Sequence, residues 1–384
     1  QLEAYLALLE KWQRRINLVA NSTMVDVWQR HILDSAQLVR FYPPNTRKIL
    51  DVGSGAGFPG LVLAIMGNVE VDLVESDQRK AIFLSTVIRS LALPAKVHNQ
   101  RIESLPNLAP DVITARALAP VSKLMKLIHS DLLKFAFEFA NQSKKILKNN
   151  YFKKFSVEEK DDGSLVTNID KEIEERFREK LKKKFPQHGV IGEEFGSEKE
   201  NNEFVWIIDP LDGTHSFIAG KPLFGTLISC TKNLKPIIGL IDIPILNQRW
   251  FGGKKLGVKL NNQVCIKPEN KKKFNDLIMA STSLLMFNKK TRNKITEIYE
   301  KVRFPIFGTD CYAYGLLLSG KIDLIIESNM KPWDYMAQAA LLEEYGGTMT
   351  DWKGDKLNVK SDGKIIASSS LNHHKEIMRL IKNL

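Results

Sequence analysis

The sequence predicts an α/β protein with two successive parts. Apolar, strand-like segments end abruptly at turns, as at residues 48–52 and 206–208, and amphipathic helical patterns follow them. The use of basic residues also changes along the chain, because residues 1–126 hold 9 Arg and 6 Lys, whereas residues 127–384 hold 6 Arg and 35 Lys. Exposed surfaces accept either residue, so we interpret the change as a boundary between two domains, 1–126 and 127–384.

The composition is that of a globular protein that works in the cytoplasm. Hydrophobic residues make up 43% of the 384 residues and charged residues 26%. Cys230, Cys265 and Cys311 lie far apart, which argues against a disulfide framework or a zinc site. We expect no membrane partner, because no apolar run approaches the roughly 18–20 residues that cross a bilayer.

The net charge of +12 is compatible with a nucleic-acid partner or with lysines spread over solvated faces. The lysine runs 182–184 and 271–273 favour the second interpretation, because no aromatic residues that could stack on bases are interleaved with them.

The N-terminal part carries the pattern of a nucleotide-cofactor site. Two helices are expected within Leu2–Tyr42, followed by a strand that runs into a glycine-rich turn at residues 48–57 and a helix over 58–66. Glycines in such a turn let the backbone approach a ligand closely. The next strand, 71–75, ends at Glu75, an acid that could bind ribose hydroxyls, so a Rossmann-like cofactor site is predicted.

The N-terminal part resembles the small-subunit rRNA guanine-N7 methyltransferase family, also called glucose-inhibited division protein B. The resemblance rests on residues 12–18, 31–35, 50–60, 99–103 and 114–120. It implies S-adenosylmethionine contacts from five residues: Gly53, Phe58, Ile102, Glu103 and Arg116. The family continues for several strands and helices beyond the last of these stretches and this chain does not, so we interpret the part as a partial Rossmann-like segment. An rRNA partner is expected only if this segment is functional.

In the C-terminal part, carboxylates stand where an apolar strand ends. The segment 206–208 stops at Asp209, Pro210 ends the sheet ladder, and Gly213 permits a tight turn into a helix. Asp209 and Asp212 can converge there only if the backbone bends, and two like charges so close call for hard divalent cations. The Leu211 carbonyl is a further oxygen ligand.

A phosphate group suits the same turn, because the amides of Gly213 and Thr214 would point from the start of a helix.

Other acidic residues have simpler interpretations when they are taken singly. Asp334 and Asp170 each precede a helical pattern and could be helix caps. Glu193 and Glu194 could be a solvated acidic pair.

Together the C-terminal segments resemble the inositol-monophosphatase superfamily over about residues 128–384. The matching motifs are Val166-Thr-x-x-Asp170, Gly192-Glu-Glu194, Asp209-Pro-Leu-Asp-Gly-Thr214 and Trp333-Asp334. The resemblance implies a layered αβαβα sandwich and a homodimer. It also implies two or three Mg²⁺ ions per site, held by Glu193, Asp209, the Leu211 carbonyl, Asp212 and Asp334.

The same resemblance implies a reaction, the hydrolysis of a small-molecule phosphate ester by a water that Asp170 and Thr214 orient and activate, with Glu193 as a further catalytic residue. The substrate contacts that it implies are Leu211, Asp212, Gly213, Thr214, Asp310, Glu327 and Asp334.

Three stretches, 216–228, 236–250 and 308–315, resemble the histidinol-phosphatase branch more than the inositol phosphatases. The inositol enzymes usually carry small apolar residues where this chain has Asp310, and an acid suits the ammonium and imidazole of histidinol phosphate. Asp310 could instead pair with a lysine or cap the helix 311–318. Glu327 aligns with a position that faces the non-phosphate end of the substrate.

The leading hypothesis is therefore a histidinol-phosphate phosphatase of histidine biosynthesis. The nearest alternative is an inositol-phosphate or broad sugar-phosphate phosphatase with the same site. Two other classes are an S-adenosylmethionine-dependent rRNA methyltransferase with an accessory C-terminal part, and a non-catalytic scaffold. The filled metal-ligand positions argue against the scaffold.

Overall fold

The computed structural model describes residues 1–43, 45–67, 69–105, 108, 110–115, 121–160, 163, 165–269 and 272–382, with the backbone alone for residues 103, 121–128 and 130. The chain divides into two compact units, Gln1–Lys123 and Leu124–Leu384. A 30-residue helix, α6 (Val121–Asn150), begins at the end of the first unit and continues into the second.

The first unit contains a parallel four-stranded sheet in the order β3-β2-β1-β4. Its strands are β1 (Lys48–Val52), β2 (Glu70–Val74), β3 (Ala95–His98) and β4 (Val112–Ala115). The helices α1 (Leu2–Gln13), α4 (Gly60–Met66) and α5 (Gln78–Leu91) supply the apolar side chains that pack with this sheet into one core. The Rossmann-like prediction is therefore confirmed for the described strands.

The two helices predicted within Leu2–Tyr42 correspond to α1 and to a largely helical stretch over residues 21–41, whose helix type changes along its length. Its segments are α2 (Asn21–Met24), a π-helix (Trp28–Leu33), α3 (Asp34–Ala36) and a 3₁₀-helix (Gln37–Phe41). Gln13 contributes to the end of α1, because its side-chain oxygen accepts hydrogen bonds from the backbone amides of Leu18 and Val19 at 3.0 and 3.1 Å. A side chain that binds backbone amides in this way competes with continuation of the helix.

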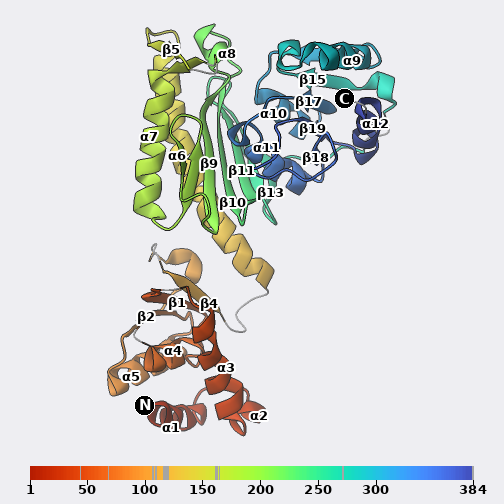
Figure 1. Cartoon of the computed structure of the whole chain (residues 1–384). Coiled ribbons are helices and arrows are strands. Elements are labelled where there is room, and N and C mark those ends of the chain that lie inside the picture. The colour runs from red at the N-terminus through yellow and green to blue at the C-terminus, as the bar shows by residue number, and fades with distance from the viewer. Residues whose placement is uncertain are drawn as a thin grey trace. The chain divides into compact units, whose positions relative to one another are not determined.

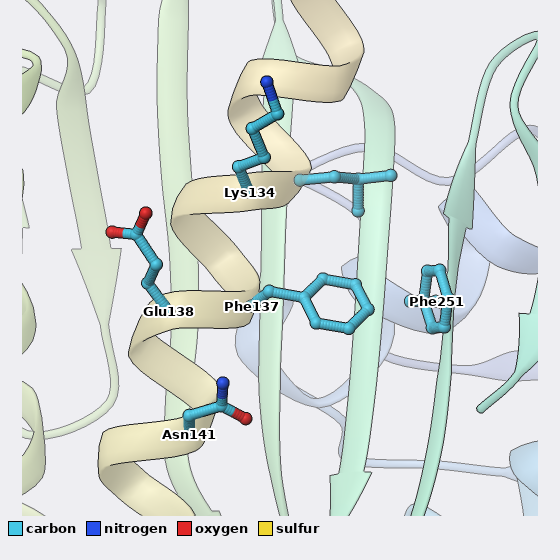
Figure 2. Close-up of a pocket in the computed structure, with 6 residues that line it drawn as sticks. Lys134, Phe137, Glu138, Asn141 and Phe251 are labelled. Carbon is cyan, nitrogen blue, oxygen red and sulfur yellow. The ribbon is translucent and has the colours of Figure 1, made fainter. Parts of the chain in front are cut away.

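The second unit consists of five layers, which confirms the predicted αβαβα sandwich (Figure 1). The helices α6 and α7 (Asn168–Lys184) cover one face of an eight-stranded sheet, whose order is β14-β13-β12-β11-β10-β9-β7-β8. The helices α10 (Tyr312–Leu318) and α11 (Pro332–Tyr345) form the middle layer. A five-stranded sheet follows in the order β16-β15-β17-β19-β18, and α9 (Lys289–Tyr299) and α12 (Leu371–Ile381) cover its far face.

The strands of the larger sheet are β7 (Gly189–Gly192), β8 (Gly196–Glu198), β9 (Phe204–Asp212), β10 (Gly225–Lys232), β11 (Lys235–Ile243), β12 (Gln248–Gly253), β13 (Gly257–Leu260) and β14 (Gln263–Val264). Those of the smaller sheet are β15 (Ile278–Ser281), β16 (Phe304–Phe307), β17 (Leu324–Glu327), β18 (Thr348–Asp351) and β19 (Ile365–Ser368). Outside both sheets, the hairpin β5 (Val157–Glu159) and β6 (Leu165–Thr167) leads into α7, and the short helix α8 (Thr214–Ile218) follows β9.

Large apolar side chains fill the space between the layers. Trp206 on β9 packs against Phe135 and Phe177 from the two covering helices, with ring centroids 4.8 and 6.0 Å apart. On the other face of the sheet, Trp250 packs in a core with residues of α10 and α11. Because both faces of β9 are buried, this strand is near-continuously apolar until Asp209. The predicted end of the strand at Asp209 is wrong, because β9 continues through Pro210 to Asp212 with a register shift in its pairing with β10. The change from apolar residues to carboxylates in this last part of β9 locates the candidate site.

A partly buried histidine, His188, is expected to make the stability of the second unit depend on pH. The His188 ring stacks on Phe185 and accepts a hydrogen bond from the Trp206 indole N–H at 3.0 Å. Burial lowers the pKa of His188 to about 4, from 6.5. In the unfolded chain the imidazole gains a proton near pH 6.5 while the folded protein resists it, so folding stability is lost as the pH falls from about 6.5 towards 4.

We expect His188→Gln to flatten this part of the stability curve, because glutamine keeps an acceptor and takes up no proton. Urea unfolding measured from pH 7.5 to 4.5 checks this expectation. An unchanged slope between pH 6.5 and 4.5 would contradict it.

No helix in the described part of the chain is both long and apolar enough to cross a membrane.

Candidate active site

Three carboxylates converge where β9 ends and α11 begins. One ligand oxygen each from Asp209, Asp212 and Asp334 lies within 4.8 Å of the others. Asp209 is buried and the other two are partly exposed, so the cluster opens towards solvent on one side. Asp334 stands in the first turn of α11 because Pro332 starts this helix, with its fixed φ and missing N–H suited to that position.

Each of these carboxylates is fixed by a backbone amide. The amide of Leu211 donates to Asp209 Oδ1 at 2.9 Å, and the amide of Lys331 donates to Asp334 Oδ2 at 2.7 Å. Asp212 Oδ2 accepts from the Cys311 amide at 2.7 Å. Within the described residues, the second oxygen of each group has no hydrogen bond, so it remains available to a ligand.

Asp170 and Thr214 lie beside this cluster. Asp170 Oδ2 accepts from the Thr167 amide at 2.8 Å and closes a capping box at the start of α7. Its other oxygen lies 3.5 Å from Thr214 Oγ1, which also lies 3.1 Å from the Leu211 carbonyl. Asp170 can therefore cap α7 and also face Thr214, because one carboxylate oxygen accepts from the Thr167 amide and the other faces the Thr214 hydroxyl.

Gly213 supplies the bend that turns β9 into α8. Its φ is +82°, a conformation that costs side-chain-bearing residues energy. A Cβ at this position would lie 2.9 Å from Asp310 Oδ2, so the glycine also lets the Asp310 carboxylate approach the turn.

Glu193 stands on the turn after β7; it is not one of the three converging carboxylates, and a lysine engages it. Lys160 Nζ lies 3.1 Å from a carboxylate oxygen of Glu193 and 3.0 Å from one of Glu194. Burial lowers the pKa of Lys160, but the two carboxylates raise it more, so the net shift is upward. Lys160 supplies positive charge to an otherwise acidic site.

Asp310 lies on a turn that is hydrogen-bonded to Asp212, one of the three converging carboxylates. Its φ is +45°, and the next residue, Cys311, donates its amide to Asp212. The Asp310 carboxylate accepts from Ser216 Oγ at 2.6 Å. Among the described contacts, it neither pairs with a lysine nor caps α10, whose N-cap Cys311 makes no side-chain cap.

Glu327, at the end of β17, is buried with 1% exposure. Oε1 accepts from the amide and the hydroxyl of Thr282 at 3.1 and 2.6 Å, and Oε2 accepts from Tyr314 OH at 2.6 Å. The structure therefore buries Glu327 with both of its carboxylate oxygens hydrogen-bonded.

The crowding of acids shifts their pKa values upward. Burial, followed by the charge of Glu193, raises the pKa of Asp209 well above its usual range. Burial and then Asp310 raise the pKa of Asp212 to about 7, and burial and then Asp212 raise that of Asp334. The pKa of Asp170 is raised to about 6, chiefly by burial. Each shift means that ionised carboxylates are unfavourable here without a compensating cation.

The residues present fit divalent cations. All the converging donors are oxygens, the donor type that Mg²⁺ prefers. The second oxygens described above point to the same conclusion, because each carboxylate has one amide partner among the described residues and a charge left incompletely paired is costly.

Five residues around the site escaped the sequence analysis. Lys160 has a weak signal, a lysine directly before an Asp-Asp-Gly turn. Glu174 could have been found from helical spacing, because it stands one turn after Asp170. Ser216, Tyr314 and Thr282 had no usable signal, since only tertiary packing brings Ser216 to Asp310 and the other two to Glu327.

In the first unit, the glycine-rich turn adopts the expected conformation, with φ of +71° at Gly53 and +55° at Gly55. Glu75 accepts from the amides of Gly55 and Asp77 at 2.9 and 2.8 Å, so it holds the turn in place. Space remains beside Gly55, where a Cβ would meet only the Gly53 carbonyl at 3.8 Å, and this fits the close approach of a cofactor.

Of the other predicted cofactor contacts, Phe58 and Ile102 pack against apolar or aromatic residues in the structure. Phe58 is buried and stacks on His31 with centroids 4.8 Å apart, and Ile102 packs on the apolar patch of Leu50 and Val52. Arg116 and the Glu103 side chain lie outside the described residues.

The five-layer fold and its carboxylate cluster define a phosphoric monoester hydrolase. The chain is matched over residues 129–384 by the model of the inositol monophosphatase family. It belongs to that family. A second model, for rRNA small subunit methyltransferase G, matches residues 1–152, so the two matches overlap over residues 129–152, largely within α6.

Individual relatives agree with both matches. The "Bifunctional phosphatase IMPL2, chloroplastic" of Arabidopsis thaliana is 40% identical over 232 residues, which are 60% of this chain and 67% of that protein. An inositol monophosphatase structure from Zymomonas mobilis has a TM-score of 0.60 and 31% identity, covering 66% of this chain and 98% of that one.

The ribosomal RNA small subunit methyltransferase G of Rhodospirillum rubrum is 56% identical over 126 residues, 33% of this chain. The chain spans 63% of that relative's length.

Proposed function

We propose that the second unit hydrolyses L-histidinol phosphate to L-histidinol and phosphate with Mg²⁺ at the carboxylate cluster. The observation that carries the proposal is the acid at position 310, held by Ser216 beside Gly213, at the edge of the predicted phosphate site. The remainder of the substrate would carry positive charge, and Asp310 supplies its complement.

The proposal assigns five metal ligands: Glu193, Asp209, the Leu211 carbonyl, Asp212 and Asp334. When bound there, divalent cations would neutralise phosphate oxygens, lower the pKa of a water and stabilise the leaving alkoxide. Asp170 would accept a hydrogen bond from Thr214 Oγ1, and this oxygen would in turn accept one from the attacking water and orient it. As the water attacks phosphorus, its proton would pass to Thr214 while the Thr214 proton passes to Asp170. The amides of Gly213 and Thr214 would hold the phosphate.

Beyond the phosphate, negative charge extends from Asp212 through Asp310 to Glu327. Asp310 contributes to the raised pKa of both Asp212 and Glu327, which means that the three carboxylates feel one another. Asp310 is partly exposed and would contact the ammonium or imidazole of the substrate directly. Glu327 would act from behind, as a buried charge and as the acceptor that holds Tyr314.

Asp310→Asn is the test of this assignment. We expect kcat/KM for histidinol phosphate to fall about tenfold to a hundredfold, the cost of losing a hydrogen bond to a charged group. Activity on inositol 1-phosphate, which has no cationic group, should change less than about threefold. Phosphate release from both esters, side by side and with Mg²⁺, is the measurement.

Asp276→Asn is the matched control, because Asp276 is exposed in a 3₁₀ turn. Equal losses on the two esters, or a preference of the parent protein for inositol 1-phosphate, would overturn the histidinol assignment and favour the alternative, an inositol-phosphate or broad sugar-phosphate phosphatase. A homodimer and a cytoplasmic location remain part of the proposal.

We infer that the first unit is a truncated methyltransferase segment. Its sheet has four strands in the described residues, and the chain spans 63% of the Rhodospirillum rubrum methyltransferase. S-adenosylmethionine binding and an rRNA substrate would belong to the alternative in which this unit is active. The residues for the cofactor would be Gly53, Phe58, Ile102, Glu103 and Arg116.

A further inference from the structure

Glu174 is fully buried on α7 and binds the turn that presents Glu193. Its Oε2 accepts from the amide of Glu194 at 2.8 Å, and its Oε1 accepts from the amide of Phe195 at 3.2 Å. Both donors follow Glu193 directly in the chain. The Glu174 carboxylate therefore fixes the backbone from which Glu193 projects.

Arg178 completes this arrangement one turn further along α7. Its Nε and Nη2 donate to Glu174 Oε1 at 2.9 and 2.8 Å, and Nη2 also donates to the Gly196 carbonyl at 2.6 Å. The guanidinium neutralises the buried charge of Glu174 and binds the far end of the same turn. A buried carboxylate that is paired and fully hydrogen-bonded in this way holds its neighbours rigidly.

Gly192 allows the close contact. A Cβ at this position would lie 2.1 Å from Glu174 Oε1, so any other residue would push the carboxylate away from the turn. The glycine before Glu193 therefore has a packing reason, in addition to its place in the sequence motif.

The electrostatics of the site depend on where this turn lies. The Glu193 charge acts on Asp209, Asp170 and Asp334 and raises the pKa of each. The proposal counts Glu193 as a ligand in addition to the three converging groups, so a displaced turn would leave the cation one oxygen donor short.

We propose that Glu174 is a positioning residue for divalent-cation binding, acting through the Glu193–Phe195 turn with Arg178 as its counter-ion. The inference rests on the proposed ligand role of Glu193. It goes beyond that role because Glu174 does not face the cluster and instead sets where a ligand of the cluster stands.

The test is Glu174→Gln in the full chain. Glutamine keeps the size but replaces one acceptor oxygen by an NH₂ group, which would face an amide of the turn or the guanidinium. We expect the dissociation constant for Mn²⁺, measured from the EPR signal of free Mn²⁺, to rise about tenfold to a hundredfold, the usual effect of removing a partner that orients a metal ligand. The Mg²⁺ concentration for half-maximal phosphatase activity should rise in parallel, while kcat at saturating Mg²⁺ stays within about threefold of the parent.

Glu175→Gln is the matched control, the same change at an exposed neighbour on the same helix, and should leave Mn²⁺ binding unchanged. Should Glu174→Gln fail to fold by circular dichroism, Arg178→Lys tests the same arrangement, because lysine keeps the charge but not the paired N–H donors, and weaker Mn²⁺ binding is again expected.

Glu193→Gln separates the two levels of the proposal. If it weakens Mn²⁺ binding and Glu174→Gln does not, the positioning role is wrong while the ligand role of Glu193 stands. If Glu193→Gln leaves Mn²⁺ binding unchanged, both are overturned. Unchanged Mn²⁺ binding with a lower melting temperature in Glu174→Gln would make Glu174 a structural residue only.

Discussion

Asp209→Asn is expected to lower phosphatase kcat/KM by on the order of a thousandfold or more. Asp209 is the most buried member of the converging carboxylates, and the proposal makes it a metal ligand. Metal-assisted stabilisation of the transition state is worth several kcal/mol, and each 1.4 kcal/mol is tenfold in rate. Phosphate release at saturating substrate and Mg²⁺ measures the loss.

The same variant is expected to melt at a higher temperature than the parent protein when EDTA is present. The pKa of Asp209 is raised in the folded state, so at neutral pH the ionised group favours unfolding, and the neutral amide removes this penalty. Addition of Mg²⁺ should then stabilise the parent more than the variant.

Asp131→Asn, an exposed position on α6, is the control and should change neither property. A variant with parental activity would refute the ligand role. A lower melting temperature in EDTA would show instead that the Asp209 carboxylate stabilises the fold.

Asp170→Asn is expected to lower kcat about a hundredfold to ten-thousandfold, the range for removing a general base. Binding of Mg²⁺ should be largely retained, because Asp170 is paired with Thr214 rather than placed among the three converging groups. The fold should also survive, since the asparagine oxygen can still accept from the Thr167 amide at the start of α7.

Changes at Thr214 give the complementary comparison. Thr214→Val should approach the loss of Asp170→Asn, whereas Thr214→Ser, which keeps the hydroxyl, should recover most of the activity. Single-turnover phosphate release separates the chemical step from product release. Retention of more than about a tenth of the parental kcat in Asp170→Asn would exclude the base role, given the range above.

Local sequence patterns were sufficient for part of the site. Asp209 and Asp212 lie three residues apart at the end of an apolar strand. Their convergence follows from the register shift between them, where three residue steps on β9 face two on β10. Asp334 is 122 positions beyond Asp212, and only the packing of α11 against the sheet brings it near. Its place was predictable from family resemblance and not from spacing.

The helix-cap and site interpretations of Asp170 and Asp334 were framed as alternatives, and the structure shows why they are compatible. In Asp334, one oxygen accepts from the Lys331 amide while the carboxylate also lies within the converging cluster. Sequence patterns describe a residue as a unit, whereas a carboxylate has two acceptors that can serve different partners.

The pairing of Lys160 with Glu193 and Glu194 depends on a contact between segments 33 and 34 residues apart, which no local pattern encodes. The changes of helix type after α1 also escaped prediction. Apolar spacing in Leu2–Tyr42 indicates helix but does not distinguish the α, π and 3₁₀ forms.

Asp170 and Glu174 leave the same rigid helix one turn apart, one bearing a group of the site directly and the other carrying the Glu193 turn. Thermal displacement of α7 as a body would therefore shift the Asp170 carboxylate and the Glu193 backbone along the same vector. The distance between the Asp170 carboxylate and the Glu193 backbone should therefore fluctuate less than the position of either group.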